Sequence, residues 1–284
     1  MPERISVRNA SLSARFTIMS TTAATPSVLS EMKGSVKWIW FNRPQVKNAL
    51  TPEVADQMRI EIEKSVDEGA RVVVISGKGG AFCSGADLKA VGPRLGENVS
   101  VKDILQNHYH PLVLAMTRLP LPVIAAVDGA SAGIGCDIAL AADLRLVSER
   151  GFFAEIFVNI NLMPDGGGSF TLSRLVGTGR ALEMAMTGCR VPADDAEKWG
   201  LANHVYATEG FEESVQQFAA QLAAKAPLSI ARSKAAIRQN QDTATFEQAL
   251  EHEAVTQQEL FETHDFGEGV MAFLEKRPPN FLGK

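Results

Sequence analysis

The sequence predicts an α/β fold followed by a helical C-terminal region. Short apolar runs alternate with helical patterns in the first part of the 284-residue chain, whereas residues 211–275 show three or four helical segments and little strand signal. The runs Arg71–Ser76 and Val123–Val127 are unbroken, which is typical of strands covered on both faces of a sheet. We therefore expect a buried, mainly parallel sheet with helices packed against it.

The elements before this sheet follow local rules. Ser35–Asn42 alternates in polarity and is rich in large side chains, which predicts a strand. Thr51 and the proline after it predict a helix start, because Thr caps the first amides and Pro fits the first turn. Apolar residues then recur every four positions, at Val54, Met58, Ile62 and Val66, until Gly69 ends the helix.

Later elements are read in the same way. We expect a helix over Val101–Arg118 that is interrupted at Pro111, and a helix over Gly135–Ala142. Leu144–Val147 predicts a further strand. After the rigid-then-flexible turn at residues 164–168, the pattern predicts helices from Thr178 onward.

Three regions follow from this organisation. Residues 1–30 form an extension, 31–205 the α/β core and 206–284 the helical C-terminal region. The extension carries several arginines among Ser, Thr and Ala, as mitochondrial leaders do, but Glu3 and a second natural start at Met19 favour an untargeted extension. We expect a cytoplasmic protein, with the mitochondrial matrix as the alternative.

Composition excludes several classes of function. The net charge of -5 argues against a nucleic-acid binder with a broad basic face. The three cysteines are far apart and form no CxxC pair, and the two neighbouring histidines, His108 and His110, lack further ligand residues nearby. We therefore expect neither a metal site nor a disulfide framework. The chain has no apolar run long enough to cross a bilayer, so we expect no membrane partner.

Two glycine-containing turns, each after an apolar run, could carry chemistry. One contains Ser84, Gly85 and Ala86, and the other contains Gly133 and Ile134. Small residues before a helix leave backbone N–H groups open to a ligand. The N–H groups of Ala86 and Ile134 could converge on one carbonyl oxygen as an oxyanion hole, in which each donor contributes about 3 kcal/mol. Plain connecting turns have the same composition, so spacing leaves both interpretations open.

Several ordered motifs give the chain a specific resemblance. They are Asn42-Arg43-Pro44 with Asn48-Ala49-Leu50, the stretch Ala81–Lys89, the run Pro122–Gly129, the turn near Gly133, Pro164–Gly168 and the tail Ala272–Arg277. Together they resemble the crotonase (enoyl-CoA hydratase/isomerase) superfamily from about Ser35 to Phe281. The resemblance implies a spiral of ββα units with a helical C-terminal trimerisation region. It also implies homotrimers or hexamers formed as dimers of trimers, an acyl-CoA thioester as substrate and no permanently bound cofactor.

The resemblance assigns acid and base residues only in part. Family hydratases hold one water between two glutamates, which align here with Asp137 and Phe157. The glutamate pair is therefore not intact. Glu155, two positions earlier, is expected to be a solvated or capping residue. Asp137 is either an exposed or capping acid early in a helix or a second catalytic carboxylate. The missing glutamate leaves open a catalytically silent CoA-binding scaffold.

Asp165 is the leading acid/base candidate. Family isomerases, including the ring-epoxide isomerase of phenylacetate breakdown and the dienoyl-CoA isomerases, resemble this chain in placing a catalytic aspartate directly after the proline. One carboxylate can take a proton from one carbon and return it to another. We therefore expect an enoyl-CoA isomerase acting on a double bond or an epoxide, with an enoyl-CoA hydratase as the alternative. An Asp before glycines is also a common helix cap.

The resemblance implies further contacts with the substrate. Basic residues are expected to face the anionic CoA, and Phe273 and Lys276 are expected to come from a neighbouring subunit. The residues expected at the acyl group and CoA are Arg43, Lys47, Ala49, Ser84, Asp87, Leu88, Lys89, Gly133, Phe157, Phe273 and Lys276.

Two other enzyme classes have partial motifs. Gly129–Gly133 fits the G-x-S-x-G elbow of serine hydrolases with Ser131 as nucleophile, although no later histidine lies in an obvious catalytic loop. The dinucleotide fingerprint fails, because Gly133 and Gly135 are followed by Ile138 where a third glycine is required. We rank both below an acyl-CoA enzyme.

Overall fold

The computed structural model describes residues 25–91, 100–240 and 245–284. It contains a six-stranded sheet in the order β1-β2-β3-β5-β7-β10 and a four-stranded sheet in the order β4-β6-β8-β9. The strands are β1 (Val28–Lys33), β2 (Val36–Phe41), β3 (Val72–Gly77), β4 (Ala81–Cys83), β5 (Val123–Val127), β6 (Ala130–Ala132), β7 (Leu144–Ser148), β8 (Phe152–Ala154), β9 (Arg190–Pro192) and β10 (His204–Tyr206). Most of the predicted extension, residues 1–24, lies outside the described residues.

The two sheets are built from a repeated unit. β3, β5 and β7 lie in the large sheet, and each is followed within a few residues by a strand of the small sheet: β4, β6 and β8. These pairs are parallel to their neighbours in both sheets. Each turn of the chain therefore adds one strand to each layer, and the expected spiral of ββα units is confirmed.

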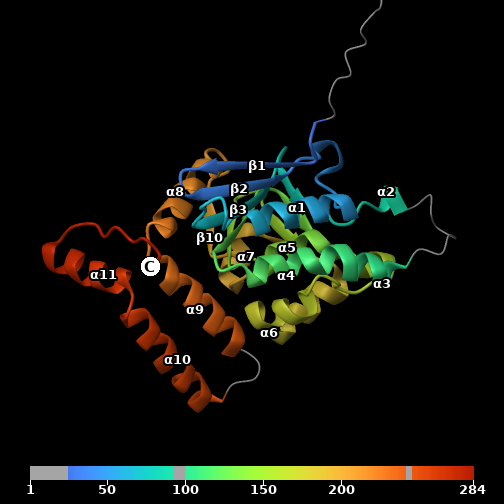
Figure 1. The fold of residues 1–284 in the computed structure, drawn as a ribbon. Coiled ribbons are helices and arrows are strands. Elements are labelled where there is room, and N and C mark those ends of the chain that lie inside the picture. Colours follow the sequence, from blue (N-terminus) through green and yellow to red (C-terminus); the bar gives the residue numbers. More distant parts are fainter. Residues whose placement is uncertain (1–24, 92–99, 241–244) are drawn as a thin grey trace, which may run out of the picture.

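Helices cover both layers and extend beyond them (Figure 1). They are α1 (Pro52–Lys64), α2 (Leu88–Val91), α3 (Val101–Ile104), α4 (His110–Arg118), α5 (Ile134–Ala141), α6 (Gly168–Thr187), α7 (Ala193–Trp199), α8 (Phe211–Ala223), α9 (Pro227–Asn240), α10 (Phe246–Phe261) and α11 (His264–Glu275). All eight residues of α5 are buried. This helix therefore lies at the centre of the fold.

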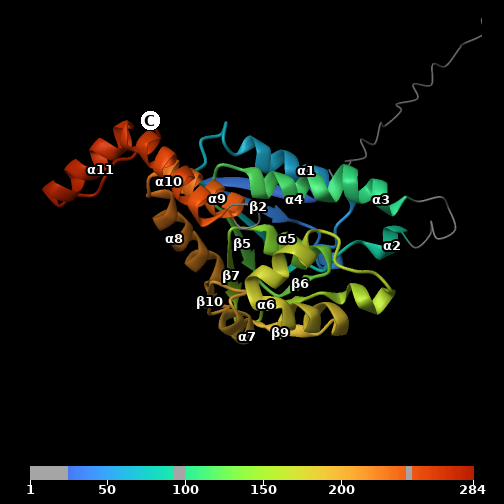
Figure 2. The same cartoon turned by 90° about the horizontal axis from the view of Figure 1, so that it is seen from below.

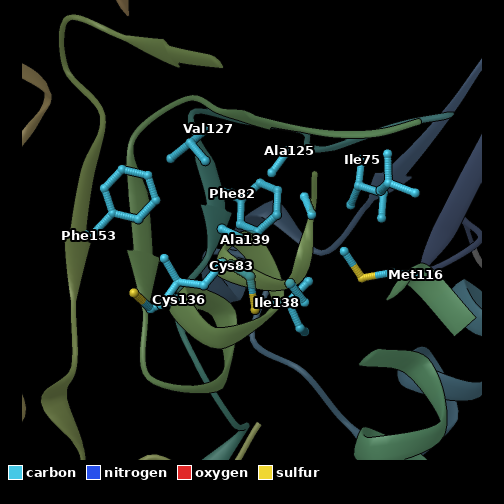
Figure 3. Close-up of a cluster of buried hydrophobic side chains, with 14 of the residues drawn as sticks. Ile75, Phe82, Cys83, Met116, Ala125, Val127, Cys136, Ile138, Ala139 and Phe153 are labelled. Atoms are coloured by element: carbon cyan, nitrogen blue, oxygen red, sulfur yellow. The ribbon is translucent and has the colours of Figure 1, made fainter. Parts of the chain in front are cut away.

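The main hydrophobic core surrounds α5 (Figure 3). Cys136 and Ile138 of this helix pack with Phe82 from β4 and Phe153 from β8. A side chain on Gly135 would place its Cβ 2.3 Å from the carbonyl oxygen of Cys83. Only glycine at position 135 therefore allows α5 to approach β4 this closely. Close packing of α5 on the small sheet fixes the first turn of this helix.

Several elements differ from their sequence prediction. The first strand begins at Val28, so the last residues of the predicted extension belong to β1, an antiparallel edge strand. Helix α1 begins after Thr51 as predicted but ends at Lys64, which leaves Val66 exposed. Helix α6 starts at Gly168, ten residues earlier than predicted, and is kinked at Gly177, whose φ is +77°.

The helix predicted over Val101–Arg118 is interrupted before Pro111. Residues Leu105–Tyr109 form one π-helical turn between α3 and α4. Such a wide turn contains one extra residue compared with an α-helix, and it often lies beside functional sites. His110 is the first residue after it.

Helices α10 and α11 project away from the two sheets (Figures 1 and 2), whereas α8 packs on the large sheet through Phe211 and Val215. The chain end folds back on α11, where the Asp265 carboxylate accepts hydrogen bonds from Leu282 N and Gly283 N, both at 2.8 Å. Arg71 at the start of the large sheet donates to the carbonyl of Phe281. The tail therefore ties α11 to the core. No helix in the described ranges is long and apolar enough to cross a membrane.

Candidate active site

The two glycine-containing turns lie side by side. β4 pairs in parallel with β6, and each turn directly follows one of these strands. A Cβ on Gly85 would lie 3.1 Å from the carbonyl oxygen of Ala132, and one on Gly133 would lie 3.8 Å from Gly85 Cα. Both glycines have positive φ, +107° at Gly85 and +53° at Gly133, which other residues adopt only with strain. Glycine is therefore required at both positions for the turns to meet.

The N–H groups of Ala86 and Ile134 are not used by the fold. Leu50 donates to Gly85 O at 2.8 Å and accepts from Asp87 N at 2.9 Å. This parallel bridge directs the N–H of Ala86, the residue between them, away from Leu50. Ile134 is the first residue of α5, where an amide has no partner inside the helix. Within the described residues, neither amide donates a hydrogen bond.

Asp137 is buried beneath the turn that precedes α6. Its side chain is 1% exposed, and Oδ2 accepts a hydrogen bond from Gly166 N at 2.7 Å. A Cβ on Gly168 would lie 2.0 Å from Asp137 Oδ1, so only glycine fits there. Burial raises the pKa of Asp137, while the Gly166 N–H acts against the rise. Asp137 therefore caps this turn from inside the protein.

Asp165 lies in the same turn and is half-buried. Its Oδ1 is buried and has no hydrogen-bond partner, whereas its backbone carbonyl accepts from His110 Nε2 at 2.8 Å. Burial raises the pKa of the Asp165 carboxyl to about 6, and the nearby His110 acts in the opposite direction. A carboxyl that titrates close to neutral pH is well suited to exchange protons with a substrate.

Glu155 corrects a sequence expectation. It was predicted to be solvated or to cap a helix, but it is 0% exposed and neither of its carboxyl oxygens has a hydrogen-bond partner. Glu155 directly precedes the 3₁₀ turn Ile156–Ile160, but its side chain makes no capping hydrogen bond to this turn. Burial, and then the charge of Asp137, raise the pKa of Glu155. The error arose because the two sheets and α5 close over this residue from distant parts of the sequence.

Phe157 lies beside the second glycine turn. It is 7% exposed and belongs to the main core, and a Cβ on Gly133 would lie 3.9 Å from Phe157 Cζ. An apolar ring therefore occupies the position that the family resemblance gives to a second glutamate. Leu162 and Met163, in the segment before Asp165, are exposed.

The residues expected to bind CoA fall into two groups. Arg43 is committed to the fold, because its guanidinium bonds Ala49 O at 2.5 Å and Asp87 Oδ2 at 2.8 Å. Ser84 N donates to Lys47 O at 3.1 Å, so the Lys47 backbone also supports the first glycine turn. The side chains of Lys47, Leu88 and Lys89 are exposed around this turn and remain accessible to a ligand.

Phe273 and Lys276 are far from this site within one chain. Both lie at the end of α11, which projects from the opposite side of the molecule to α2 and the first glycine turn (Figures 1 and 2). The Phe273 side chain is 82% exposed. Within one chain, these two residues therefore do not belong to the site.

Ser131 does not form a nucleophile elbow. It lies within β6, is 0% exposed, and its Oγ donates to the carbonyl oxygen of Gly135 in α5 at 3.1 Å. A serine nucleophile needs an exposed Oγ at the top of such a turn. The described residues also contain no cluster of three or more His, Cys, Asp or Glu side chains that could hold a metal ion.

Comparison with known proteins identifies the family of this chain. The sequence model of the enoyl-CoA hydratase/isomerase family matches residues 31–284. The chain belongs to the enoyl-CoA hydratase/isomerase family. It is 38% identical to a probable enoyl-CoA hydratase of Rhodobacter capsulatus, with 89% of this chain and 97% of that protein covered. It is 34% identical to the 1,2-epoxyphenylacetyl-CoA isomerase of Escherichia coli, with 90% and 98% covered.

Solved structures of this family show the same fold. An enoyl-CoA hydratase from a Polaromonas species superimposes with a TM-score of 0.85 at 31% identity, covering 90% of this chain and 99% of that one. Similar relatives therefore include both hydratases and an isomerase. Membership in the enoyl-CoA hydratase/isomerase family does not by itself choose between the two reactions.

Sequence reasoning gave no role to two residues of the site. His110 was considered only as part of a weak metal pair, and nothing local in the sequence indicates its bond to the Asp165 carbonyl. The burial of Glu155 could have been predicted from the sequence, because Glu155 is the one charged residue in the otherwise apolar run Phe152–Val158. A lone carboxyl in such a run indicates burial, and a buried carboxyl usually has a function.

Proposed function

We propose that this protein is an enoyl-CoA isomerase in which Asp165 is the single acid/base. The supporting observation is that, of Asp137 on α5 and Asp165 on the turn before α6, only Asp165 is partly exposed. Asp137 is buried under Gly166 and Gly168, whereas Asp165 is half-buried with an unpartnered oxygen. Phe157 leaves no second carboxylate at the position where family hydratases have one.

The proposed reaction begins with the thioester carbonyl between the two glycine turns. Its oxygen accepts hydrogen bonds from Ala86 N and Ile134 N, which are otherwise unused. The Asp165 carboxylate removes a proton from a carbon of the acyl chain, and the electron pair moves onto the thioester oxygen as an enolate. The two N–H groups stabilise this charge. Asp165 then returns the proton to a different carbon, so that the double bond moves and no atom is lost.

Hydration is the second candidate. The charge of Asp165 raises the pKa of Asp137, and the charges of Asp137 and Asp165 raise the pKa of Glu155, so more than one acid is available near the turn. The named hydratases among the relatives, such as the 2,3-dehydroadipyl-CoA hydratase of Escherichia coli at 32% identity, also favour it. Hydration requires a second group that orients water, and Asp137 would then be that group.

One assay separates the candidates. Purified protein is incubated with crotonyl-CoA and with a 3-enoyl-CoA, and products are followed by mass and ultraviolet absorbance. Conversion of the 3-enoyl-CoA without a change in mass supports the isomerase. Addition of water to crotonyl-CoA with no isomerisation contradicts it and supports the hydratase. Absence of both reactions, with CoA still bound, supports a catalytically silent CoA-binding scaffold.

We further propose that the enzyme acts as a homotrimer or as a hexamer formed by two trimers. Phe273 and Lys276 would then contact CoA bound to a neighbouring chain, since they lie far from the site in their own chain. Exposed Lys47 and Lys89 would face the anionic part of the same CoA. Coenzyme A enters as part of the substrate, no other cofactor is required, and the proposed location is the cytoplasm.

A further inference from the structure

Glu155 lies directly behind the second glycine turn. Gly133 N donates to Ala154 O at 2.9 Å, which fixes the end of β8 beside this turn. Phe153 of β8 points into the core next to Cys136 (Figure 3). Because side chains two apart on an extended chain share a face, Glu155 also faces α5. Its carboxyl therefore lies beneath the helix that carries Ile134 and Asp137.

Buried acceptors without partners gather around this helix. They are both carboxyl oxygens of Glu155, Oδ1 of Asp137 and Oδ1 of Asp165. An ionised carboxylate can only accept hydrogen bonds, so three ionised groups here would repel one another and supply no donor. A protonated carboxyl removes one charge and adds one O–H donor. The cluster is therefore expected to hold at least one proton at neutral pH.

The hydrogen-bond partners decide which group carries the proton. Asp137 Oδ2 accepts from Gly166 N at 2.7 Å, and the amides of Asp165 and Gly168 also favour its charged form. Glu155 has no such donors, although the Cys136 thiol lies near enough to lower its pKa slightly against the effect of burial. Hydrogen-bond donors favour the ionised form of the carboxyl that accepts their bonds. The proton therefore belongs on Glu155.

We propose that Glu155 is a positioning residue: as a neutral acid beneath α5, it keeps Asp137 anionic against the 165–168 turn and thereby holds Asp165 in place. The role in turnover rests on the proposed function of Asp165, whereas the location of the proton does not. The groups that act on Glu155 are Cys136 and Asp137 from α5 and Asp165 from the turn. From the side of α4, His110 lowers the pKa of Asp165 on the same turn, and the charge of Asp165 raises the pKa of Tyr109.

The proposal gives a definite pH dependence. Glu155 has a raised pKa in the folded protein, so the folded state keeps a proton that the unfolded chain has already released. Stability therefore falls as pH rises from the ordinary glutamate value, about 4.3, towards the folded one. Once Glu155 ionises, two buried carboxylates repel each other, and Asp137 is driven from the amides of the turn.

The first test measures the proton without any substrate. Infrared spectra of the ligand-free protein at neutral pH are compared for wild type, Glu155→Gln and the exposed control Glu149→Gln. We expect a carboxylic-acid carbonyl band in wild type and in the control, and its loss in Glu155→Gln. A band of unchanged size in Glu155→Gln would overturn the proposal. Titration of the wild-type band decides the question even if the variant fails to fold.

The second test measures the position of the turn. Hydrogen exchange of the Gly166 amide is followed in wild type and Glu155→Gln as pH rises from about 7 to about 10. After correction for base catalysis, we expect exchange to accelerate roughly tenfold in wild type and to stay constant in the variant. Equal acceleration in both proteins would overturn the positioning role.

The third test uses whichever CoA thioester the wild type turns over. We expect kcat to decline at alkaline pH in wild type and in Glu149→Gln, and the decline to disappear in Glu155→Gln. A decline that is the same in all three contradicts the positioning role. If wild type turns over neither substrate while the infrared and exchange results hold, the proposed isomerase fails and the role of Glu155 stands.

Discussion

Helix α5 and helix α10 show two opposite ways of using a helix. All eight residues of α5 are buried, among them Asp137, whereas none of the sixteen residues of α10, all of them described, is buried. Apolar side chains such as Phe246, Val255 and Phe261 remain exposed on α10. Helix α5 is therefore covered on all sides within one chain, while α10 and α11 present apolar surface that a single chain leaves uncovered.

The largest expected effect on activity comes from a substitution beside the buried helix α5. Asp165→Asn removes the proposed base and keeps the shape of the side chain, so kcat should fall by about 10²–10⁴ with little change in CoA binding. Steady-state kinetics and calorimetry with CoA measure the two quantities. The matched control is Asp67→Asn, an exposed carboxylate after α1, which should leave both unchanged. Full activity of Asp165→Asn would rule out this residue as the acid/base.

Removing one backbone donor should have the next largest effect. Proline is tolerated at the first position of a helix, so Ile134→Pro deletes the N–H of Ile134 while α5 can still form. We expect kcat to fall by about 10²–10³. Ile134→Ala is the control, because it loses a similar part of the buried side chain but keeps the donor. If both variants lose the same activity, the amide has no special role.

The pH dependence of kcat/KM tests the proposed role of Asp165 without a substitution. Asp165 must be ionised to accept a proton, and its pKa is raised to about 6. We therefore expect kcat/KM to be constant near neutral pH and to fall about tenfold for each pH unit below that value. A limb that begins only near the ordinary aspartate pKa, about 3.9, would show that burial does not tune the base in solution.

The smallest effect on the chain itself is expected at the C-terminal helices. Phe273→Ser and Leu274→Ser replace side chains that are 82% and 68% exposed, so the unfolding of an isolated chain should change by about 0.5 kcal/mol or less. The molar mass in solution should nevertheless fall towards that of one chain. Light scattering measures this molar mass, and the control is Val66→Ser, which replaces an exposed apolar side chain just after α1. An unchanged mass would show that α11 does not mediate assembly.

The sequence predicts the parts of the fold that local patterns determine. The buried strands β3 and β5 are apolar runs, and α1 is marked by Thr51, whose hydroxyl accepts from Val54 N as expected for a cap. β1 was missed because an edge strand with one exposed face has a weak pattern. The start of α6 was missed because two glycines precede it, a third is its first residue and Gly177 divides it.

The site shows the same division. The glycines that allow the two turns to meet are visible in the sequence, and so is the aspartate after Pro164. The contacts that bury Glu155 are not, because they depend on β8, α5 and the turn before α6 closing around one side chain. The bond between His110 and the Asp165 carbonyl joins residues 55 positions apart. Such contacts follow from the packing of the spiral and leave no local pattern.

The π-helical turn at Leu105–Tyr109 has a genetic consequence. His108 on this turn contacts Asp56 of α1 at 2.8 Å, whereas His110 just beyond it reaches the Asp165 carbonyl at 2.8 Å. The wide turn accommodates one extra residue, so loss of a single codon within it is absorbed by a return to regular winding, whereas the same loss inside α4 rotates the residues that follow by about 100°. A one-residue deletion in the wide turn would therefore disturb the packing of α4 less than a deletion within α4 itself.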